Sequence, residues 1–234
     1  MKTKTLLTTL AAAAAIFSQA QVTLTSRLST LEYDYLYGWH GDVVQDRFSS
    51  SSSDLLASDS MASYFYSDSW SGGYGWWAFV EETMDNSYSI SGELDDVRAI
   101  SGAGTTQIEA GCDQESLSQM RSYNGVTFNF SVAREQRYVL TGTLDWAGYA
   151  LDPGNQTQLR IERWNGAWWD IVYWTPTMPD GRGAFSTRGI LPPGEYRIWC
   201  NLLERAFGNE TKEQSYSFVL SFIKRPIPLP RVGG

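Results

Sequence analysis

The sequence predicts an all-β protein, an antiparallel two-sheet β-sandwich of jelly-roll type with about ten strands. Three observations support this fold class. Apolar and polar residues alternate with a period of two through most of the chain, helical periodicity is hard to find after the first twenty residues, and Gly/Pro turns separate the alternating segments. Strands with one apolar face are typical of antiparallel sheets, and many of them joined by such turns favour a sandwich.

Three segments show the alternation most clearly. Their apolar faces are Val126, Phe128, Phe130 and Val132 in "VTFNFSV", Tyr138, Leu140, Leu144 and Trp146 in "YVLTGTLDW", and Tyr216, Phe218, Leu220 and Phe222 in "SYSFVLSF". The segment "GILPPGEYRIWC" predicts a turn, because Pro193 presets φ at one central position and Gly194 accepts a positive φ at the next. A further strand then begins with Tyr196 and Ile198.

The N-terminal third is less regular. "TLEYDYLYGW" alternates like a strand, but the Ser-rich segment near 49–75 could be a flexible arm or an irregular edge of the sheet. Its aromatic residues argue against full disorder. We expect "SMASYFYSD" and "GWWAFVEE" to form strands and Ser49 to Ser53 to form a loop.

The first twenty residues resemble a secretory signal peptide. Lys2 and Lys4 precede the apolar run "LLTTLAAAAAIF", and "SQA" predicts cleavage after Ala20. The apolar run is too short to span a bilayer, so no membrane insertion is expected. We therefore expect a secreted, extracellular or periplasmic protein, with one sandwich domain over 21–224 and a C-terminal tail over 225–234.

The net charge of the mature chain limits the classes of partner that we expect. Removing Lys2 and Lys4 leaves 16 basic against 26 acidic residues, a net charge of −10 with histidine neutral. Nucleic acids and anionic membranes bind mainly through Lys and Arg, so neither is an expected partner. A polysaccharide or another extracellular protein remains.

The stretch "WNGAWWDIVYW" holds four of the ten tryptophans, and Asn165-Gly166 predicts a hairpin turn within it. A two-residue loop would pair Ile161 with Asp170 and mix charged and aliphatic residues on both faces. A three-residue loop would pair Ile161 with Trp169 and separate the faces cleanly, so we favour it. One face would then hold Leu159, Ile161, Trp169, Ile171 and Tyr173, and the other Arg160, Glu162, Trp168, Asp170, Val172 and Trp174, with Trp164 at the loop.

The second face is a candidate ligand-binding surface. Exposed Trp164, Trp168 and Trp174 beside Arg160 and Glu162 would suit a sugar, because flat rings stack on pyranose C–H faces while polar neighbours bond hydroxyl groups. The alternative is that these rings are packed, either by the Ser-rich segment or by another subunit.

Catalysis has little support, so we expect no enzyme activity. His40 is the only histidine, which excludes a His pair for zinc, and "WHGD" has no G-x-S-x-G partner. Glu93 and Asp95 begin a pattern similar to the E-x-D-x-x-E strand of laminarinase-like jelly rolls, but Arg98 stands where the general acid/base would be. A glycoside hydrolase is therefore the least favoured function, and a solvated turn is the simpler interpretation of the acidic residues.

Two further features are weak site candidates. Asp145 and Asp152 bracket the loop "DWAGYALDPGNQ" and could hold a structural Ca²⁺, although no D-x-D-x-D-G loop is present; no other cofactor is expected. Cys112 and Cys200 are the only cysteines. They could form a disulfide after export, or Cys200 could be a buried small hydrophobic residue on the face of Tyr196 and Ile198.

Three segments carry a family resemblance: "SISGELDDVRAISGAGTTQ" at 89–107, "TFNFSVAREQRYVLTGTLDW" at 127–146 and "GILPPGEYRIWC" at 189–200. In this order they resemble uncharacterised exported bacterial β-sandwich proteins. They are more loosely similar to pre-peptidase C-terminal and carbohydrate-binding jelly rolls. The resemblance implies a fold and no catalytic residue, so we expect a secreted, non-catalytic binding or structural module.

Overall fold

The computed structural model describes residues 22–39, 42–71, 76–113, 116–146, 156–175 and 182–223. These residues form twelve strands: β1 (Val22–Trp39), β2 (Asp42–Ser52), β3 (Ser58–Ser71), β4 (Trp76–Glu93), β5 (Asp96–Cys112), β6 (Ser116–Val132), β7 (Gln136–Trp146), β8 (Gln156–Trp164), β9 (Trp169–Trp174), β10 (Arg182–Leu191), β11 (Gly194–Phe207) and β12 (Glu210–Ile223). No helix long and apolar enough to cross a membrane is found among the described residues.

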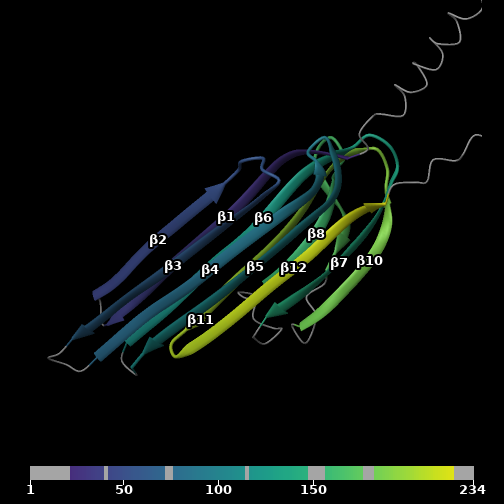
Figure 1. Ribbon diagram of the computed structural model, residues 1–234. Coiled ribbons are helices and arrows are strands. Elements are labelled where there is room, and N and C mark those ends of the chain that lie inside the picture. The colour runs from purple at the N-terminus through teal and green to yellow at the C-terminus, as the bar shows by residue number, and fades with distance from the viewer. Residues whose placement is uncertain are drawn as a thin grey trace, which may run out of the picture.

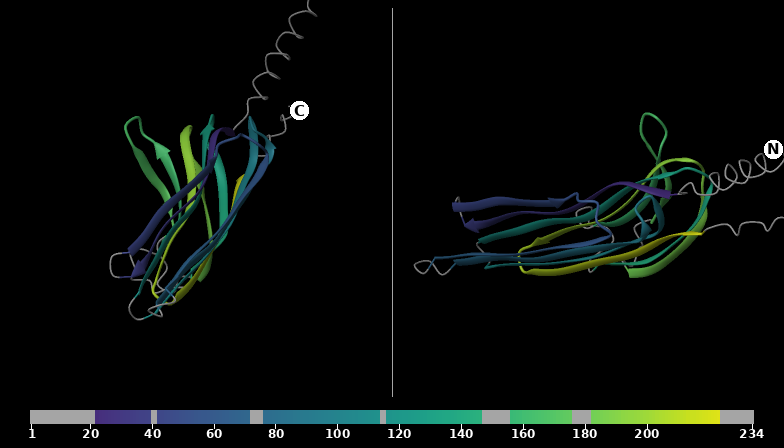
Figure 2. Two further views of the ribbon diagram at one scale, coloured as in Figure 1. Left: turned by 90° about the vertical axis from the view of Figure 1, so that its left-hand side faces the viewer. Right: turned by 45° about the horizontal axis from the view of Figure 1, so that its top comes forward.

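The strands build two six-stranded sheets, which Figure 2 shows as two stacked layers. Sheet A has the order β2-β1-β6-β11-β8-β9 and sheet B the order β10-β7-β12-β5-β4-β3, with every neighbouring pair antiparallel. The last eight strands alone form two four-stranded sheets, β6-β11-β8-β9 and β5-β12-β7-β10, which is jelly-roll order. The predicted fold class is confirmed. Strands β1 and β2 widen sheet A beside β6, and strands β3 and β4 widen sheet B beside β5 (Figure 1).

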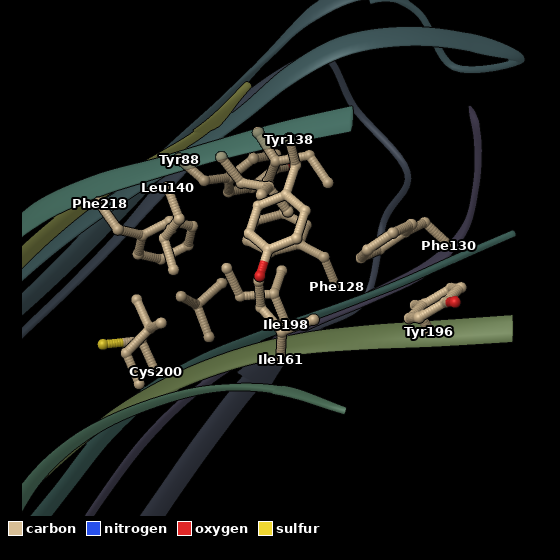
Figure 3. Packing of buried hydrophobic residues seen from close by; sticks show 14 of the residues in the cluster. Tyr88, Phe128, Phe130, Tyr138, Leu140, Ile161, Tyr196, Ile198, Cys200 and Phe218 are labelled. Carbon is tan, nitrogen blue, oxygen red and sulfur yellow. The ribbon is translucent and has the colours of Figure 1, made fainter. Parts of the chain in front are cut away.

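The alternation in the sequence predicts which residues are buried. Phe128, Phe130, Leu140, Phe218 and Leu220 are at most 1% exposed, and all belong to one large hydrophobic cluster between the sheets. Figure 3 shows rings from both sheets meeting there. Phe130 of sheet A and Phe222 of sheet B, for example, meet edge to face with ring centroids 5.5 Å apart. The chain bends at Pro193 as predicted, but Gly194 has φ +155° rather than the about +80° of a type II turn, and it already begins β11.

The Ser-rich segment differs from the prediction. Ser49–Ser52 do not form a loop but end strand β2, where they pair with Ser29–Glu32 of β1. The segments expected as strands are strands, β3 and β4. The described residues form twelve strands rather than about ten. A ladder is formed by backbone N–H and C=O groups, so the Ser-rich segment can pair although its side chains do not predict a strand.

One buried charge holds the Ser-rich edge in place. Arg27 of β1 is 2% exposed, and its guanidinium donates to the Ser52 hydroxyl at 2.7 Å and to the Asp54 carbonyl at 2.9 Å. It also forms an ion pair with Asp59 of β3 at 3.3 Å and lies 4.4 Å from the centre of the Tyr88 ring. These contacts join β1, β2, β3 and β4 at one point.

Candidate functional site

The β8–β9 hairpin carries all five predicted ligand-binding residues, and its register differs from the one predicted from the sequence. Arg160 pairs with Trp174, Arg163 with Asp170, and Trp164 with Trp169, which matches neither predicted register. The loop therefore has four residues, 165–168. In Figure 2 this hairpin stands out from the body of the sandwich.

Asn165 explains the longer loop. Its side-chain oxygen accepts hydrogen bonds from the backbone N–H groups of Ala167 and Trp168, both at 3.0 Å, and its amide donates to Asp170 at 3.0 Å. Gly166 follows at φ +101°, a conformation that suits glycine. The Asn-Gly turn signal was therefore correct, but the side chain of Asn165 closes a wider turn than the two central residues alone would.

The observed register changes which residues face the core. Trp169 and Ile171, predicted as core, lie on the outer side; Trp169 is only half-buried, and Ile171 is 54% exposed. A bulge between Ile161 and Glu162 restores Tyr173 to the core side, where it packs against the large cluster. β9 is the edge strand of sheet A, and its residues Ile171, Val172 and Trp174 are exposed.

Four tryptophans and two arginines gather on the face of sheet A that points away from sheet B. We call this set the tryptophan platform: Trp164, Trp169, Trp174, Trp199, Arg160 and Arg197, together with Glu162. They share a face because Arg160 and Glu162 alternate with buried Leu159 and Ile161 on β8, and Arg197 and Trp199 alternate with buried Tyr196 and Ile198 on β11.

Cation–π contacts order the platform into two rows. In the first, the Arg160 guanidinium lies 5.4 Å from the centre of the Trp174 ring and 4.9 Å from that of Trp199, its partners on either side. In the second, the Arg197 guanidinium lies 4.5 Å from the centre of the Trp169 ring and hydrogen-bonds Glu162, its partner across the ladder. Such contacts fix the planes of the rings before any ligand arrives.

The outcome for the five predicted ligand-binding residues is mixed. Trp174 and Trp164 are about 40% exposed and belong to the platform with Arg160. Glu162 is there too, but it is only 3% exposed because the arginines and rings around it cover its carboxylate. Trp168 is 64% exposed at the hairpin loop, where its indole N–H donates to Asp170, one residue out of phase with the platform residue Trp169.

Sequence reasoning missed Trp169, Trp199 and Arg197. The signal for the last two was present, since "GEYRIWC" alternates and places Arg197 and Trp199 opposite the core residues Tyr196 and Ile198. The sequence did not show which strand lies beside this one in the sheet. Only the strand order brings β11 beside β8.

A polar hollow of about 180 Å³ lies on sheet A further along β11. Its lining residues are Glu32, Tyr33, Asp34, Arg47, Arg121, Ser122, Tyr123 and Leu203. Leu203 follows Trp199 by four residues on the same strand face, about 13 Å at the rise of an extended strand. The Glu32 carboxylate pairs with Arg47 at 3.0 Å on one wall. On this face of β11, Asn201 alone lies between Trp199 of the platform and Leu203 of the hollow.

The remaining site candidates are not brought together. Asp145 is exposed on β7, and Asp152 and His40 lie outside the described residues. Within the described ranges no group of three or more His, Cys, Asp or Glu side chains is arranged to hold a metal ion. Glu93 ends β4 and Asp95 lies in the turn before β5. Both side chains are exposed, as expected for a solvated turn.

The disulfide alternative needs correction. Cys112 and Cys200 are both free and buried. Cys200 lies in the large cluster on sheet A (Figure 3), whereas Cys112 ends β5 of sheet B within a second, smaller cluster. Cys200 is thus the small buried hydrophobic residue that its strand face predicts.

Comparisons with known proteins add little to this geometry. No protein-family model matches the chain, and no curated protein matches it. A search of solved structures finds a chain described as "Cowpea mosaic virus top component (CPMV-T) - naturally occurring empty particles", with 9% identity, coverage of 89% of this chain and 91% of that chain, and a TM-score of 0.27. The fold assignment above rests on the strand order itself.

Proposed function

We propose that this chain is an exported, non-catalytic binding module that recognises a polysaccharide through the tryptophan platform. The observation that supports this most is the row Trp174–Arg160–Trp199, in which two indole rings flank a guanidinium across three adjacent strands. Rings held on strands rather than on loops keep their positions, so binding costs little side-chain entropy.

The chemistry of the platform suits sugar rings. Indole faces offer flat apolar area to the C–H face of a pyranose, and the arginine side chains between them offer N–H donors for ring hydroxyls. The polar hollow about 13 Å further along β11 would accept further sugar units of the same chain. A polymer rather than a single sugar is therefore the expected ligand.

The proposal includes no reaction on this face. Glu162, the carboxylate of the platform, is covered and paired with Arg197 and Arg160, so it is not free to accept a proton from a substrate. Hydrolysis of a glycoside needs two carboxyl groups on either side of the bond that is cleaved.

The test uses the mature protein and a panel of soluble and insoluble, neutral and acidic polysaccharides. Binding is measured by pull-down and by quenching of tryptophan fluorescence in wild type, Trp174→Ala and Trp168→Ala. Because Trp174 belongs to the platform and Trp168 does not, we expect Trp174→Ala to weaken binding about tenfold or more, and Trp168→Ala to leave it within about twofold. No saturable binding to any polysaccharide, or equal losses in both variants, would contradict the proposal.

A protein partner is the second candidate, and one observation favours it. The hairpin exposes Ile171 and Val172 beside Trp164 and Trp168, each about 40 to 64% exposed, and contiguous apolar surface of this kind often marks a protein contact. Light scattering of the pure protein tests self-association there. A dimer or larger species that dissociates on Ile171→Asp would favour assembly over glycan binding.

A further inference from the structure

The outer face of sheet B carries a group of exposed aromatic side chains at the end where β4 begins. Tyr64 and Tyr66 of β3 are 66% and 49% exposed, and Trp77 of β4 is 40% exposed. The centre of the Phe79 ring lies 6.3 Å from that of Tyr66 and 6.0 Å from that of Trp77, with ring planes that differ by 28° and 19°. The Phe79 ring also lies over Gly111 of β5, where a Cβ would be only 2.1 Å from it. Three of the rings therefore form a connected aromatic surface.

Carboxylates border these rings. Tyr66 pairs with Glu81 across the β3–β4 ladder, and Glu81 pairs with Glu109 across the β4–β5 ladder, so two like charges lie directly opposite each other. The Tyr64 hydroxyl donates to Glu81 at 3.2 Å, and the Tyr66 hydroxyl donates to Asp68 at 3.2 Å. Glu81 and Glu109 also line a small hollow of about 80 Å³. We call this set the aromatic-acidic face: Tyr64, Tyr66, Trp77, Phe79, Asp68, Glu81 and Glu109.

Within the described strands of sheet B, basic residues lie away from this face. β3 and β4 contain no Lys or Arg, and the arginine of β5, Arg98, lies near the opposite end of the strand from Glu109. Lys212 of β12 pairs with Glu210 at 3.4 Å. Like charges directly opposite each other destabilise a sheet, and exposed rings beside carboxylates suit a partner that is both apolar and cationic.

The chain itself contains a segment of this chemistry. After Ile223 the sequence continues with "KRPIPLPRVGG" over 224–234, which has three basic residues, three prolines and no acidic residue. Alternate prolines favour the polyproline II conformation, which packs on aromatic side chains, and Arg pairs well with carboxylates. In a mature chain of net charge −10, this segment is complementary in both charge and apolar character to the aromatic-acidic face.

The segment cannot reach this face on its own chain. β12 runs along sheet B from Thr211, the ladder neighbour of Glu109, to Ile223, about 40 Å away at the rise of an extended strand (Figure 1). The rings lie beyond Glu109, further still from Ile223. Arg231 is eight residues after Ile223, a stretch that spans at most about 29 Å when fully extended. A segment that covers the rings must therefore come from a second copy.

We propose that segment 224–234 of one copy docks as a polyproline II helix on the aromatic-acidic face of a second copy. Its prolines and aliphatic residues would pack on the rings of Tyr66, Phe79 and Trp77, while its basic side chains pair with Glu81 and Glu109. Because segment and face are different surfaces of each copy, the contact is head-to-tail and can continue from copy to copy. The contact is independent of the proposed glycan binding, since the tryptophan platform belongs to the other sheet.

A synthetic peptide with the sequence of 224–234, titrated into the mature wild-type protein in a calorimeter, tests the contact. We expect saturable binding of one peptide per chain, weakened about fivefold or more between 50 and 500 mM NaCl because salt screens exposed charges. Glu81→Gln/Glu109→Gln should weaken binding about tenfold, and it should fold at least as stably as wild type because it removes a like-charge contact. The matched control Glu93→Gln/Glu195→Gln, two exposed carboxylates elsewhere, should stay within about twofold.

Sedimentation velocity of the full mature chain tests docking between copies. The average mass should rise with protein concentration, and either Arg225→Glu/Arg231→Glu or excess peptide should return it to that of the monomer, whereas Ile171→Asp at the hairpin should not. A peptide with its three prolines replaced by alanine should bind about fivefold more weakly at the same charge. Wild-type protein that binds no peptide, or that stays monomeric at every concentration, would overturn the proposal. So would equal losses in the two glutamine variants, or equal affinity for the two peptides.

Discussion

Glu162 and Arg197 pair directly across the β8–β11 ladder, and Glu162 is 3% exposed although it lies on the outer face of its sheet. The Trp169 ring, 4.5 Å from the Arg197 guanidinium, helps to cover the pair. This ion pair is costly to break, because the Arg197 side chain is only 33% exposed and regains only part of its hydration when it loses its partner.

Glu162→Gln should therefore lower the free energy of unfolding by about 1 to 3 kcal/mol, measured by urea denaturation at pH 7. Glu195→Gln, an exposed carboxylate two residues before Arg197 on the same strand, is the control and should change it by less than about 0.5 kcal/mol. Equal effects of the two substitutions would mean that the covered pair contributes nothing specific.

Arg27 should be a second sensitive position, at the Ser-rich edge. Arg27→Lys keeps the charge but loses the planar fork that reaches Ser29, Ser52 and Asp59 at once, so we expect a loss of about 2 to 4 kcal/mol. Arg47→Lys, in the exposed pair with Glu32, should cost less than about 0.5 kcal/mol. Thermal unfolding followed by circular dichroism compares the two.

Two buried carboxyl groups, Glu82 of β4 and Glu204 of β11, predict an unusual dependence of stability on pH. Glu82 and Glu204 have folded pKa values raised from 4.5 to about 9 and about 8, so the folded state binds more protons than the unfolded state between these limits. Their contribution to stability is complete below about pH 4.5 and is lost as the pH rises through 8 to 9, at up to about 1.4 kcal/mol per pH unit for each carboxyl group.

Urea unfolding at pH 6, 7, 8 and 9 measures that slope. Glu82→Gln should flatten the curve, and Glu81→Gln, its neighbour on the opposite face, should leave it unchanged. A wild-type stability that stays constant or increases from pH 6 to 9 would show that the two carboxyl groups do not titrate in this range.

Two glycines differ in the kind of atom that an added Cβ would meet. A Cβ added at Gly142 would lie 2.1 Å from the backbone oxygen of Ser217, which belongs to the central ladder and cannot move. At Gly111 the obstacle, also at 2.1 Å, is the ring of Phe79, a half-buried side chain that can rotate away. Gly142→Ala should cost about 2 to 3 kcal/mol and Gly111→Ala about 1 kcal/mol or less, as measured from the Tm. The reverse order would contradict this packing.

The free thiols give a chemical test of the core. Burial raises the pKa of both Cys112 and Cys200, that of Cys200 more strongly, so both should be unreactive in the folded protein. Iodoacetamide should alkylate two thiols per chain after unfolding without reductant, and Cys200 least in the native state, as mass spectrometry would show. An unfolded, unreduced chain that accepts no label would indicate a disulfide instead.

The sequence by itself determined the fold class and the buried faces. Val126 to Val132 and Tyr216 to Phe222 are buried where the alternation predicts, because a period of two decides which side of a strand meets the core whatever its neighbours are. The Asn165-Gly166 turn was predictable from its two residues, whereas the exposure of Trp164, Trp168 and Trp174 was only one of two alternatives that the sequence left open.

Only the tertiary structure decided which strands are neighbours. The platform joins Arg160 to Trp199, which are 39 residues apart in number, and Glu82 of sheet B and Glu204 of sheet A are both buried. The hairpin register also escaped prediction, since the side chain of Asn165 and a bulge at Ile161 decide it rather than the hydrophobic pattern. The alternation of apolar and polar residues predicts on which face of a strand a residue lies. Strand order and register depend on long-range packing, so no local stretch of the sequence contains them.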